Sequence, residues 1–364
     1  MPLSPLPALT HLRALSDDTG IIQHAFHDVP NRSTGYCVDD VARAFIVAVQ
    51  ASSHAGMREE ALRLGRVYLS FLHDAQRDDG RFRNFMAYDR RWLDDVGSED
   101  SFGRAVWALG FGVQRAPAES WRKVCRHMLD RAAAAIPNLE WIRARALCTL
   151  GLGYASDAQS GNEMDRRILR TLASDFAARF REHSTETWRW FEPSMTYDNG
   201  RLCEAPIRAG MALDDPTFVA VGMEALSFLE SLTFEGDRFV PIGNAGWCDR
   251  GGARARFHQQ PLEAAAMVDA ELAAYAVSSD RARLERAADA FSWYLGRNDL
   301  HEPLVRGGGC CDGLSSDALN PNMGAESTLA YLSSAFALAE AQHAVTAKSP
   351  IDARRNRRPQ RRPA

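Results

Sequence analysis

The chain alternates between two kinds of helical segment. Some stretches are rich in Ala and Leu and carry few charges after their first turn, whereas the stretches between them carry Arg and Glu along one side. A helix that is apolar on most faces is buried on most faces, and an amphipathic helix covers the outside. The pattern predicts inner helices over residues 39–51, 99–112, 140–154, 204–213, 262–277 and 325–343, and outer helices over 57–74, 118–135, 164–182, 216–230 and 280–295.

The inner segments begin in similar ways, mostly with an acidic residue before an alanine-rich run. The equivalent positions are spaced by 61, 41, 63, 59 and 63 residues, and they are Asp39, Asp100, Trp141, Glu204, Glu263 and Glu326. Spacing of this size is typical of stacked helical hairpins. Pro206 and Pro261 fall in the first turns of their predicted helices, where proline is tolerated.

The connections between these segments are unequal in length. Each inner helix is followed by a short connection, whereas long loops over 75–98, 183–203, 231–260 and 296–324 lead to the next inner helix. Because the inner helices of such hairpins all point the same way, we expect the long loops on one rim, beside the inner-helix N-termini. Long ordered loops on a rigid scaffold usually carry function. Two of them contain short strand patterns, at 79–85 and 235–240.

The last inner segment is as apolar as the middle ones. This favours a closed ring, because an open stack would need polar caps on its terminal hairpins. No sixth outer helix follows residue 344, so we expect the segment near Leu9–Leu15 in that place. The sequence therefore predicts an all-α fold, an (α/α)6 toroid of six helical hairpins with short β-hairpins in its long loops. We expect residues 1–346 to form this single domain, and the arginine-rich tail over 347–364 to be disordered.

Composition and charge exclude several classes of protein. A net charge of -4 argues against nucleic-acid binding, and no apolar run is long enough to predict a membrane span. The seven cysteines are scattered without CxxC spacing, which indicates neither a disulfide framework nor a zinc site. The first residues lack the basic and apolar segments of a secretory signal, and we expect a cytoplasmic protein.

Acidic residues gather at the predicted rim, where the doublets Asp39-Asp40 and Glu99-Asp100 begin two inner helices. Aromatic residues occur in the neighbouring loops, and carboxylates beside aromatic rings suit a sugar, with acid and base roles divided between two carboxyl groups. Acids also favour helix N-termini for structural reasons, as caps and in pairs such as Asp39 with Arg43. One cap suffices for a helix, so the second acid of each doublet favours a functional role.

Five segments together suggest a family: 35–44, 97–105, 190–199, 259–264 and 324–330. They resemble a family of bacterial six-hairpin glycosidase-like proteins that occur beside, or fused to, sugar-nucleotide glycosyltransferases. The resemblance covers residues 20–343. It implies an (α/α)6 fold and a carbohydrate ligand, and it makes a glycosyltransferase a candidate partner.

We therefore expect a glycoside hydrolase-like enzyme that cleaves an oligosaccharide or glycoconjugate by carboxylate acid/base catalysis, without a metal or cofactor. Asp40 and Asp100 are the predicted acid/base pair, and Glu263 is the third catalytic candidate. The residues expected to bind the sugar are Asp39, Glu99, Tyr36, Trp190, Glu192, Tyr197, Asp198, Glu204, Trp247, Gln260 and Glu326.

Two other classes of function stay open. A sugar epimerase or isomerase of the toroid type would bring His24, His27, His258 or His301 together at the floor of the ring. A non-catalytic glycan-binding partner of a glycosyltransferase would carry aromatic residues on the rim, but no acid pair at the catalytic separation of about 5 to 9.5 Å.

Overall fold

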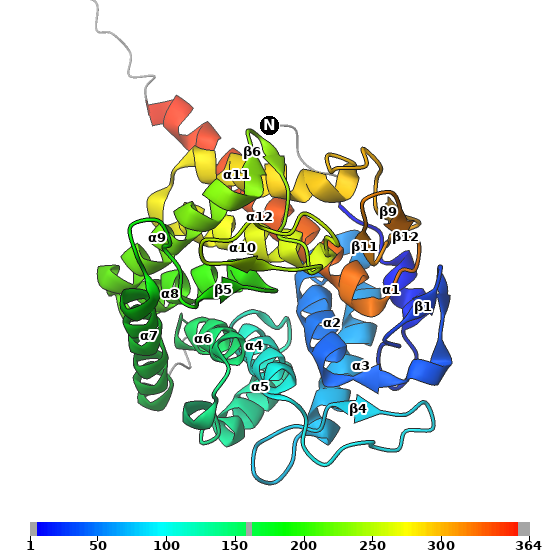
Figure 1. Cartoon of the computed structure of the whole chain (residues 1–364). Helices are drawn as coiled ribbons and strands as arrows, with labels where there is room; N and C mark the ends of the chain where they lie inside the picture. Colours follow the sequence, from blue (N-terminus) through cyan, green and yellow to red (C-terminus); the bar gives the residue numbers. More distant parts are fainter. Residues whose placement is uncertain (1–5, 158–161, 356–364) are drawn as a thin grey trace, which may run out of the picture.

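Helices dominate the computed structural model, which describes residues 6–157 and 162–355 (Figure 1). The inner helices are α2 (Val38–Ala51), α4 (Glu99–Arg115), α6 (Ile142–Asp157), α8 (Asn199–Leu213), α10 (Pro261–Ser278) and α12 (Ala325–Arg355). The outer helices are α3 (Arg58–Ala75), α5 (Glu119–Ala132), α7 (Glu163–His183), α9 (Pro216–Thr233) and α11 (Arg281–Ser292), together with the short α1 (Thr10–Leu15). The predicted alternation of inner and outer helices is confirmed.

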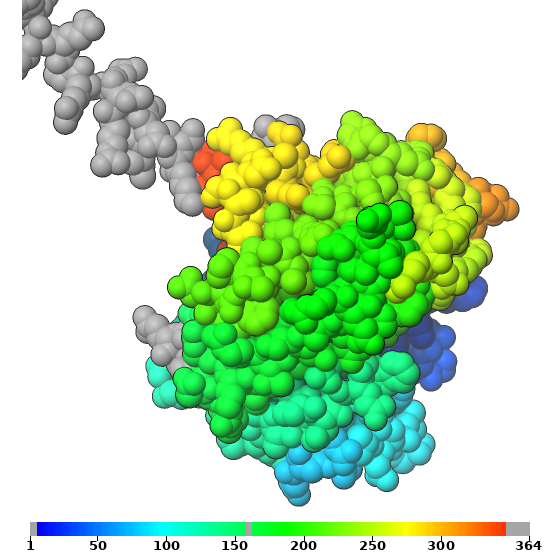
Figure 2. Space-filling view, turned by 60° about the vertical axis from the view of Figure 1, so that its left-hand side comes forward, coloured from blue at the N-terminus to red at the C-terminus, as the bar shows by residue number. Residues whose placement is uncertain are grey.

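The inner helices form a closed ring. Each packs against the next along the chain, and α12 packs against α2, so the last inner helix meets the first (Figure 1). Each outer helix lies against its own inner helix, and α1 lies against α12 in the sixth outer place, as the sequence predicted. The space-filling view shows the side wall of the ring, where the green and lime surface, which includes the outer helices α7 and α9, is continuous (Figure 2). The fold is an (α/α)6 toroid.

Close contact between neighbouring inner helices depends on glycine. A Cβ atom on Gly110 of α4 would lie 1.9 Å from the carbonyl oxygen of Gly151 on α6, and one on Gly200 of α8 would lie 2.3 Å from the carbonyl oxygen of Ala266 on α10. Backbone atoms cannot give way as a flexible side chain can, so only glycine fits at these crossings. The inner helices therefore pack closely around the axis of the ring.

Two-residue antiparallel strand pairs occur in the loops of the rim. The strand pattern predicted within 235–240 is confirmed as the pair of β6 with β7. The strand predicted within 79–85 contributes only Phe85 to β4, which pairs with β3 from the loop before α2. The pairs are β1 (Ala25–Phe26) with β2 (Val29–Pro30), β3 (Tyr36–Cys37) with β4 (Phe85–Met86), β5 (Ser194–Met195) with β8 (Cys248–Asp249), β6 (Phe234–Glu235) with β7 (Arg238–Phe239), β9 (Val305–Arg306) with β10 (Gly309–Cys310), and β11 (Gly313–Leu314) with β12 (Leu319–Asn320). Of these pairs, β3 with β4 and β5 with β8 link consecutive rim loops, and the other four are hairpins within one loop.

The start of α8 differs from the prediction. The helix begins at Asn199 and not at residue 204, and Pro206 therefore lies inside it and not in its first turn. Asp198 precedes the helix in a left-handed conformation, and the carboxylate of Glu263 accepts the backbone N–H groups of Asp198 and Asn199. Because a side chain from α10 satisfies these first donors, the helix can begin before the proline that the sequence pattern took as its start.

The last inner helix is longer than the predicted segment 325–343. Helix α12 continues to Arg355, and residues 356–364 of the predicted disordered tail lie outside the described residues. Within the described ranges no helix combines the length and apolar character needed to cross a bilayer. The seven cysteines are buried and free.

Candidate active site

The N-terminal halves of the inner helices enclose a small cavity on the axis of the ring. Its polar walls come from arginines and acids, and its apolar walls come from α2, α4, α10 and α12. The lining residues are Arg43, Ile46, Arg104, Trp107, Asp198, Arg201, Leu262, Ala265, Glu326, Leu329, Ala330 and Ser333. We call this space the central cavity. Because helices far apart in sequence contribute to it, only ring closure assembles it.

Arg43 of α2 and Arg104 of α4 connect acids from different helices. Arg43 lies 2.9 Å from Asp40 Oδ1 and 2.8 Å from Glu326 Oε2. Arg104 lies 2.8 Å from Asp39 Oδ1 through Nε and 3.0 Å from Asp198 Oδ2 through Nη2. The contact between Arg104 Nε and Asp39 Oδ1 is an ion pair without the alignment of a hydrogen bond. The two arginines thus connect the N-termini of α12, α2, α4 and α8 in one ion-pair network.

Arg201 of α8 extends this ion-pair network into the ring. It lies 2.7 Å from both Glu204 Oε2 and Asp269 Oδ2, and Arg208 contacts Glu204 from the next turn at 3.1 Å. We did not find Arg201 from the sequence. An arginine three residues before an acid can pair with it on one face of a helix. Because the predicted start of α8 was residue 204, Arg201 fell outside the predicted helix and this pairing was not expected.

Asp100 occupies a different setting from the paired acids. Its nearest guanidinium atom, Arg104 Nη2, is 4.0 Å away, and Tyr197 donates a hydrogen bond of 3.2 Å to its Oδ2 atom. Arg143 of α6 holds Tyr197 in place, because its guanidinium lies 4.8 Å from the centre of the tyrosine ring and donates to the Tyr197 carbonyl oxygen. Arg143 also pairs with Glu192 at 3.0 Å. Tyr197 is therefore a fixed neighbour of Asp100.

Exposure separates the acids into two groups. The side chains of Asp39 and Asp100 are 24% and 26% exposed, and that of Glu326 is 44% exposed. Asp40 is enclosed behind Asp39, and Asp198 and Glu204 are also buried. A molecule entering from the rim can therefore reach Asp39, Asp100 and Glu326. Asp40 instead accepts hydrogen bonds from Arg43 and Cys37.

Burial changes the proton affinity of three carboxyl groups. It raises the pKa of Asp40 to about 6, against the opposing charge of Arg43. It also raises the pKa of Asp100, which Arg104 opposes. Burial and the nearby Asp198 raise the pKa of Glu263 to about 7, while the N–H donors of Asp198 and Asn199 act in the opposite direction. Of these groups, Asp100 combines a raised pKa with an accessible side chain, which is the setting of a general acid.

The shared guanidinium limits the distance between two carboxylates. Asp198 Oδ2 and Asp100 Oδ2 lie 3.0 and 4.0 Å from the same atom, Arg104 Nη2. The two oxygen atoms are therefore no more than about 7 Å apart. Asp39 contacts the same guanidinium through Nε, so it too lies close to Asp100.

Several residues predicted to bind sugar lie inside the protein. Trp190 has no exposed surface and packs against Phe191, so it cannot offer a ring face to a ligand. Tyr36 is buried and donates to Asp17. Glu204 lies in the second turn of α8, because the helix begins earlier than predicted, and it is enclosed by Arg201 and Arg208. These three predictions were wrong in placing the side chains on the open rim.

Two further acids serve helix ends. The carboxylate of Glu99 accepts the backbone N–H groups of Glu140 and Trp141 at 2.9 Å, at the N-terminus of α6. Glu263 does the same for α8. In both cases an inner helix supplies a carboxylate to the start of a neighbouring inner helix, which is the structural role considered from the sequence.

The remaining predicted residues, Trp247 and Gln260, lie partly exposed on the rim. Trp247 belongs to the loop before β8 and has a positive φ of 58°. Gln260 precedes α10 and makes no side-chain cap there. Neither lines the central cavity.

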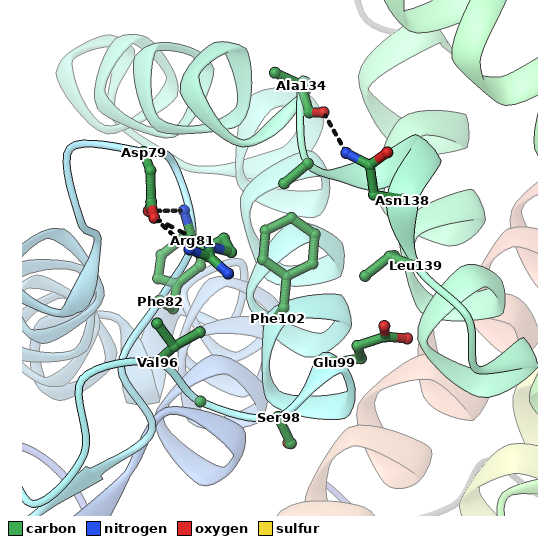
Figure 3. A pocket seen from close by; sticks show the side chains of 12 residues that line it. Asp79, Arg81, Phe82, Val96, Ser98, Glu99, Phe102, Ala134, Asn138 and Leu139 are labelled. Carbon is green, nitrogen blue, oxygen red and sulfur yellow. Dashed lines mark hydrogen bonds and ion pairs between the residues drawn. The ribbon is translucent and has the colours of Figure 1, made fainter.

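A second pocket of about 400 Å³ lies on the outer side of the rim (Figure 3). Phe82, Phe102 and Leu139 give it apolar walls, and the Asp79–Arg81 pair stands at one side. Trp141, which follows this segment, is 69% exposed and presents a large ring at the start of α6. No group of three or more metal-binding side chains occurs within the described part of the chain.

No protein-family model and no curated protein sequence matches this chain. The fold is similar to solved sugar-active enzymes. A sugar epimerase from a ruminal bacterium aligns over 91% of this chain and 94% of its own, with a TM-score of 0.69 and 12% identity. The cellobiose 2-epimerase from Bacillus thermoamylovorans aligns over 93% and 96%, with a TM-score of 0.69 and 11% identity. The cellulase Cel9M of C. cellulolyticum in complex with cellobiose aligns over 88% of each chain, with a TM-score of 0.60 and 8% identity. At these identities the similarity establishes the toroid alone.

Proposed function

We propose that the protein is a carbohydrate-active enzyme that cleaves a glycosidic bond at the mouth of the central cavity. The observation that carries the proposal is the contrast between Asp100, which is accessible and has a raised pKa, and Asp39, which is accessible and held by two arginines. Two carboxyl groups in different electrostatic settings can divide acid and base duties across a sugar linkage.

In this mechanism Asp100 donates its proton to the glycosidic oxygen as the bond between that oxygen and the anomeric carbon breaks. A water molecule forms the new bond to the anomeric carbon, and Asp39 accepts the proton that the water loses. Solvent then returns a proton to Asp100 and removes one from Asp39. Asp39 replaces Asp40 in this role because Asp40 is enclosed.

The remaining residues position these groups. Arg104 contacts Asp39 and Asp198 and holds both acids near Asp100. Tyr197, fixed by Arg143, donates to Asp100. Glu326 is the most exposed acid in contact with Arg43 and is proposed to accept hydrogen bonds from sugar hydroxyls.

The test is a panel of oligosaccharides incubated with the purified protein, with products identified by mass spectrometry. Asp100→Asn and Asp39→Asn should each lower turnover by about a hundred to ten thousand-fold. Asp95→Asn, which changes an exposed acid in a rim loop, should leave turnover unchanged. Full turnover in Asp100→Asn would contradict the assignment of the acid, and absence of cleavage of every sugar in the panel would contradict the reaction.

Epimerisation or isomerisation of a sugar is the second candidate, because the similar structures include a sugar epimerase, a cellobiose 2-epimerase and a D-mannose isomerase. The four histidines that this reading predicted at the floor are exposed, and none is among the described residues that line the central cavity. The two reactions differ in their products. Incubation in D2O introduces deuterium beside the carbonyl carbon during epimerisation, whereas hydrolysis yields two shorter sugars.

A glycosyltransferase partner is a further part of the proposal, resting on the family resemblance. Co-purification of the two proteins from their source would support it. If the protein bound oligosaccharides without changing them, a glycan-binding role beside that partner would replace the enzyme proposal.

A further inference from the structure

The ring has a second opening, at the C-terminal ends of the inner helices. A cavity of about 510 Å³ lies there, and every one of the inner helices contributes to its lining. Its size is within the range of about 300 to 1,000 Å³ of small-ligand sites. We call this space the lower cavity. It lies on the face opposite the rim loops and outside the proposed reaction.

Aromatic side chains supply much of its apolar surface. Phe111 of α4 and Tyr154 of α6 pack edge to face with ring centres 5.0 Å apart, and the guanidinium of Arg208 lies 4.1 Å from the centre of the Tyr154 ring. Tyr275 of α10 lines the same space and is partly exposed. Such rings can pack on the apolar C–H faces of a sugar.

Two residues of the walls each carry a buried polar atom that has no hydrogen-bond partner among the described residues. The atoms are the indole Nε1 of Trp107, a side chain that is only 6% exposed, and the Oε1 atom of Gln50. One is a donor and the other an acceptor. Leaving a buried polar group unpaired costs about 1 to 3 kcal/mol, so such groups in native proteins generally meet water or a ligand.

The charged residues around the lower cavity are already paired. Arg115 contacts Glu340 across the opening, Arg208 contacts Glu204, and Asp269 contacts Arg201. A charged ligand would have to compete with these contacts, whereas a neutral ligand would not. We propose that the lower cavity binds a neutral mono- or disaccharide.

This site is distinct from the proposed catalytic one but adjoins it. Ile46, Trp107 and Ser333 line both cavities. A probe must therefore separate binding at the lower cavity from binding at the rim. The residues Ala276 of α10 and Ala337 of α12 line only the lower cavity, so larger side chains at these positions would fill it from below.

The experiment follows the indole N–H resonance of Trp107 in 15N-labelled protein during titration with D-mannose, D-glucose and cellobiose. The resonance is assigned from its loss in Trp107→Phe. We expect at least one sugar to shift it in the wild type, and the shift to be abolished, or to need about tenfold more sugar, in Ala276→Phe. Ala220→Phe, a matched change at an exposed alanine of outer helix α9, should behave as the wild type does.

The other variants make the result decisive. Ala337→Phe should reproduce the effect of Ala276→Phe, and it replaces that variant if the latter fails to fold by circular dichroism. Asp100→Asn should retain the shift while losing turnover, which separates this proposal from the proposed reaction. A shift that persists in both phenylalanine variants, or no shift with any of the three sugars, would overturn the proposal.

Discussion

Replacing Arg104 tests whether the ion-pair network stabilises the centre of the ring. The side chain is 5% exposed and contacts Asp39, Asp198 and, more distantly, Asp100. Arg104→Gln removes the cation beside the buried Asp198 and the partly exposed Asp39 and Asp100. Removing one partner from a buried ion pair costs about 3 to 5 kcal/mol, because the remaining charge is uncompensated. We expect the free energy of unfolding to fall by this amount at pH 7.5.

The pH dependence of that loss has a definite sign. Burial raises the pKa of Asp100 and Arg104 opposes this, so removing Arg104 raises it further. An acid whose pKa is higher in the folded state contributes stability below its unfolded pKa and loses it as pH rises through the folded pKa. The deficit of Arg104→Gln should therefore shrink as the pH is lowered from 7.5 towards 4.5.

Urea unfolding followed by circular dichroism at both pH values measures this directly. The control is Arg63→Gln on outer helix α3, where Arg63 and Glu60 form an ion pair with side chains 50% and 30% exposed. Such a pair contributes at most about 1 kcal/mol. If Arg104→Gln costs no more than Arg63→Gln, or if its cost does not change with pH, the argument that Arg104 organises the centre is refuted.

Three further predictions concern packing and buried acids. Gly110→Ala should lower the free energy of unfolding by more than about 1 kcal/mol, because the new methyl group would meet the Gly151 carbonyl oxygen, and thermal unfolding measures this. Burial raises the pKa of Glu271, so its contribution to stability falls as pH rises; relative to Glu271→Gln, the wild type should lose unfolding free energy between pH 5 and 8 in urea titrations. Tyr197 donates to Asp100 and lowers its pKa, so Tyr197→Phe should move the alkaline limb of the pH–activity profile to higher pH.

Each of these has its own control or contrary result. Gly56→Ala introduces a methyl group with no atom within 4 Å and should leave the melting temperature unchanged. Parallel pH profiles of stability for Glu271→Gln and the wild type would show that the buried carboxyl group is not the source of the dependence. An alkaline limb that stays in place in Tyr197→Phe would indicate that Asp100 is not the proton donor.

The fold could be predicted because its signal is repeated along the whole chain. Buried helices and surface helices differ in composition over many residues, and the ring follows from six such units and from an apolar last helix. The start of α8 could not be found in the same way. Its first N–H groups are satisfied by Glu263, which is 64 residues away from Asn199, and no local pattern reports such a contact.

The sequence predicts where along the helices the acids of the candidate site gather, but not which arginine each acid contacts. The helix N-termini and the rim loops identify where the acids gather, and the spacing of Asp39 with Arg43 hints at local pairs. Which acid remains accessible depends on contacts between helices, such as Arg104 with Asp198. Trp190 illustrates the same limit, because its burial against Phe191 depends on how the loop before α8 folds onto the outer helices.

The arrangement of charges explains why the accessible acids can differ in function. Helix N-termini favour ionised carboxylates, so acids placed only there would all remain charged. One turn deeper, two arginines lie beside Asp39, which contacts both Arg43 and Arg104. Asp100 lies 4.0 Å from its nearest guanidinium atom and keeps a raised pKa through burial. The difference between these two neighbouring helix starts therefore arises from the position of the Arg104 guanidinium, which contacts Asp39 at 2.8 Å and lies 4.0 Å from Asp100.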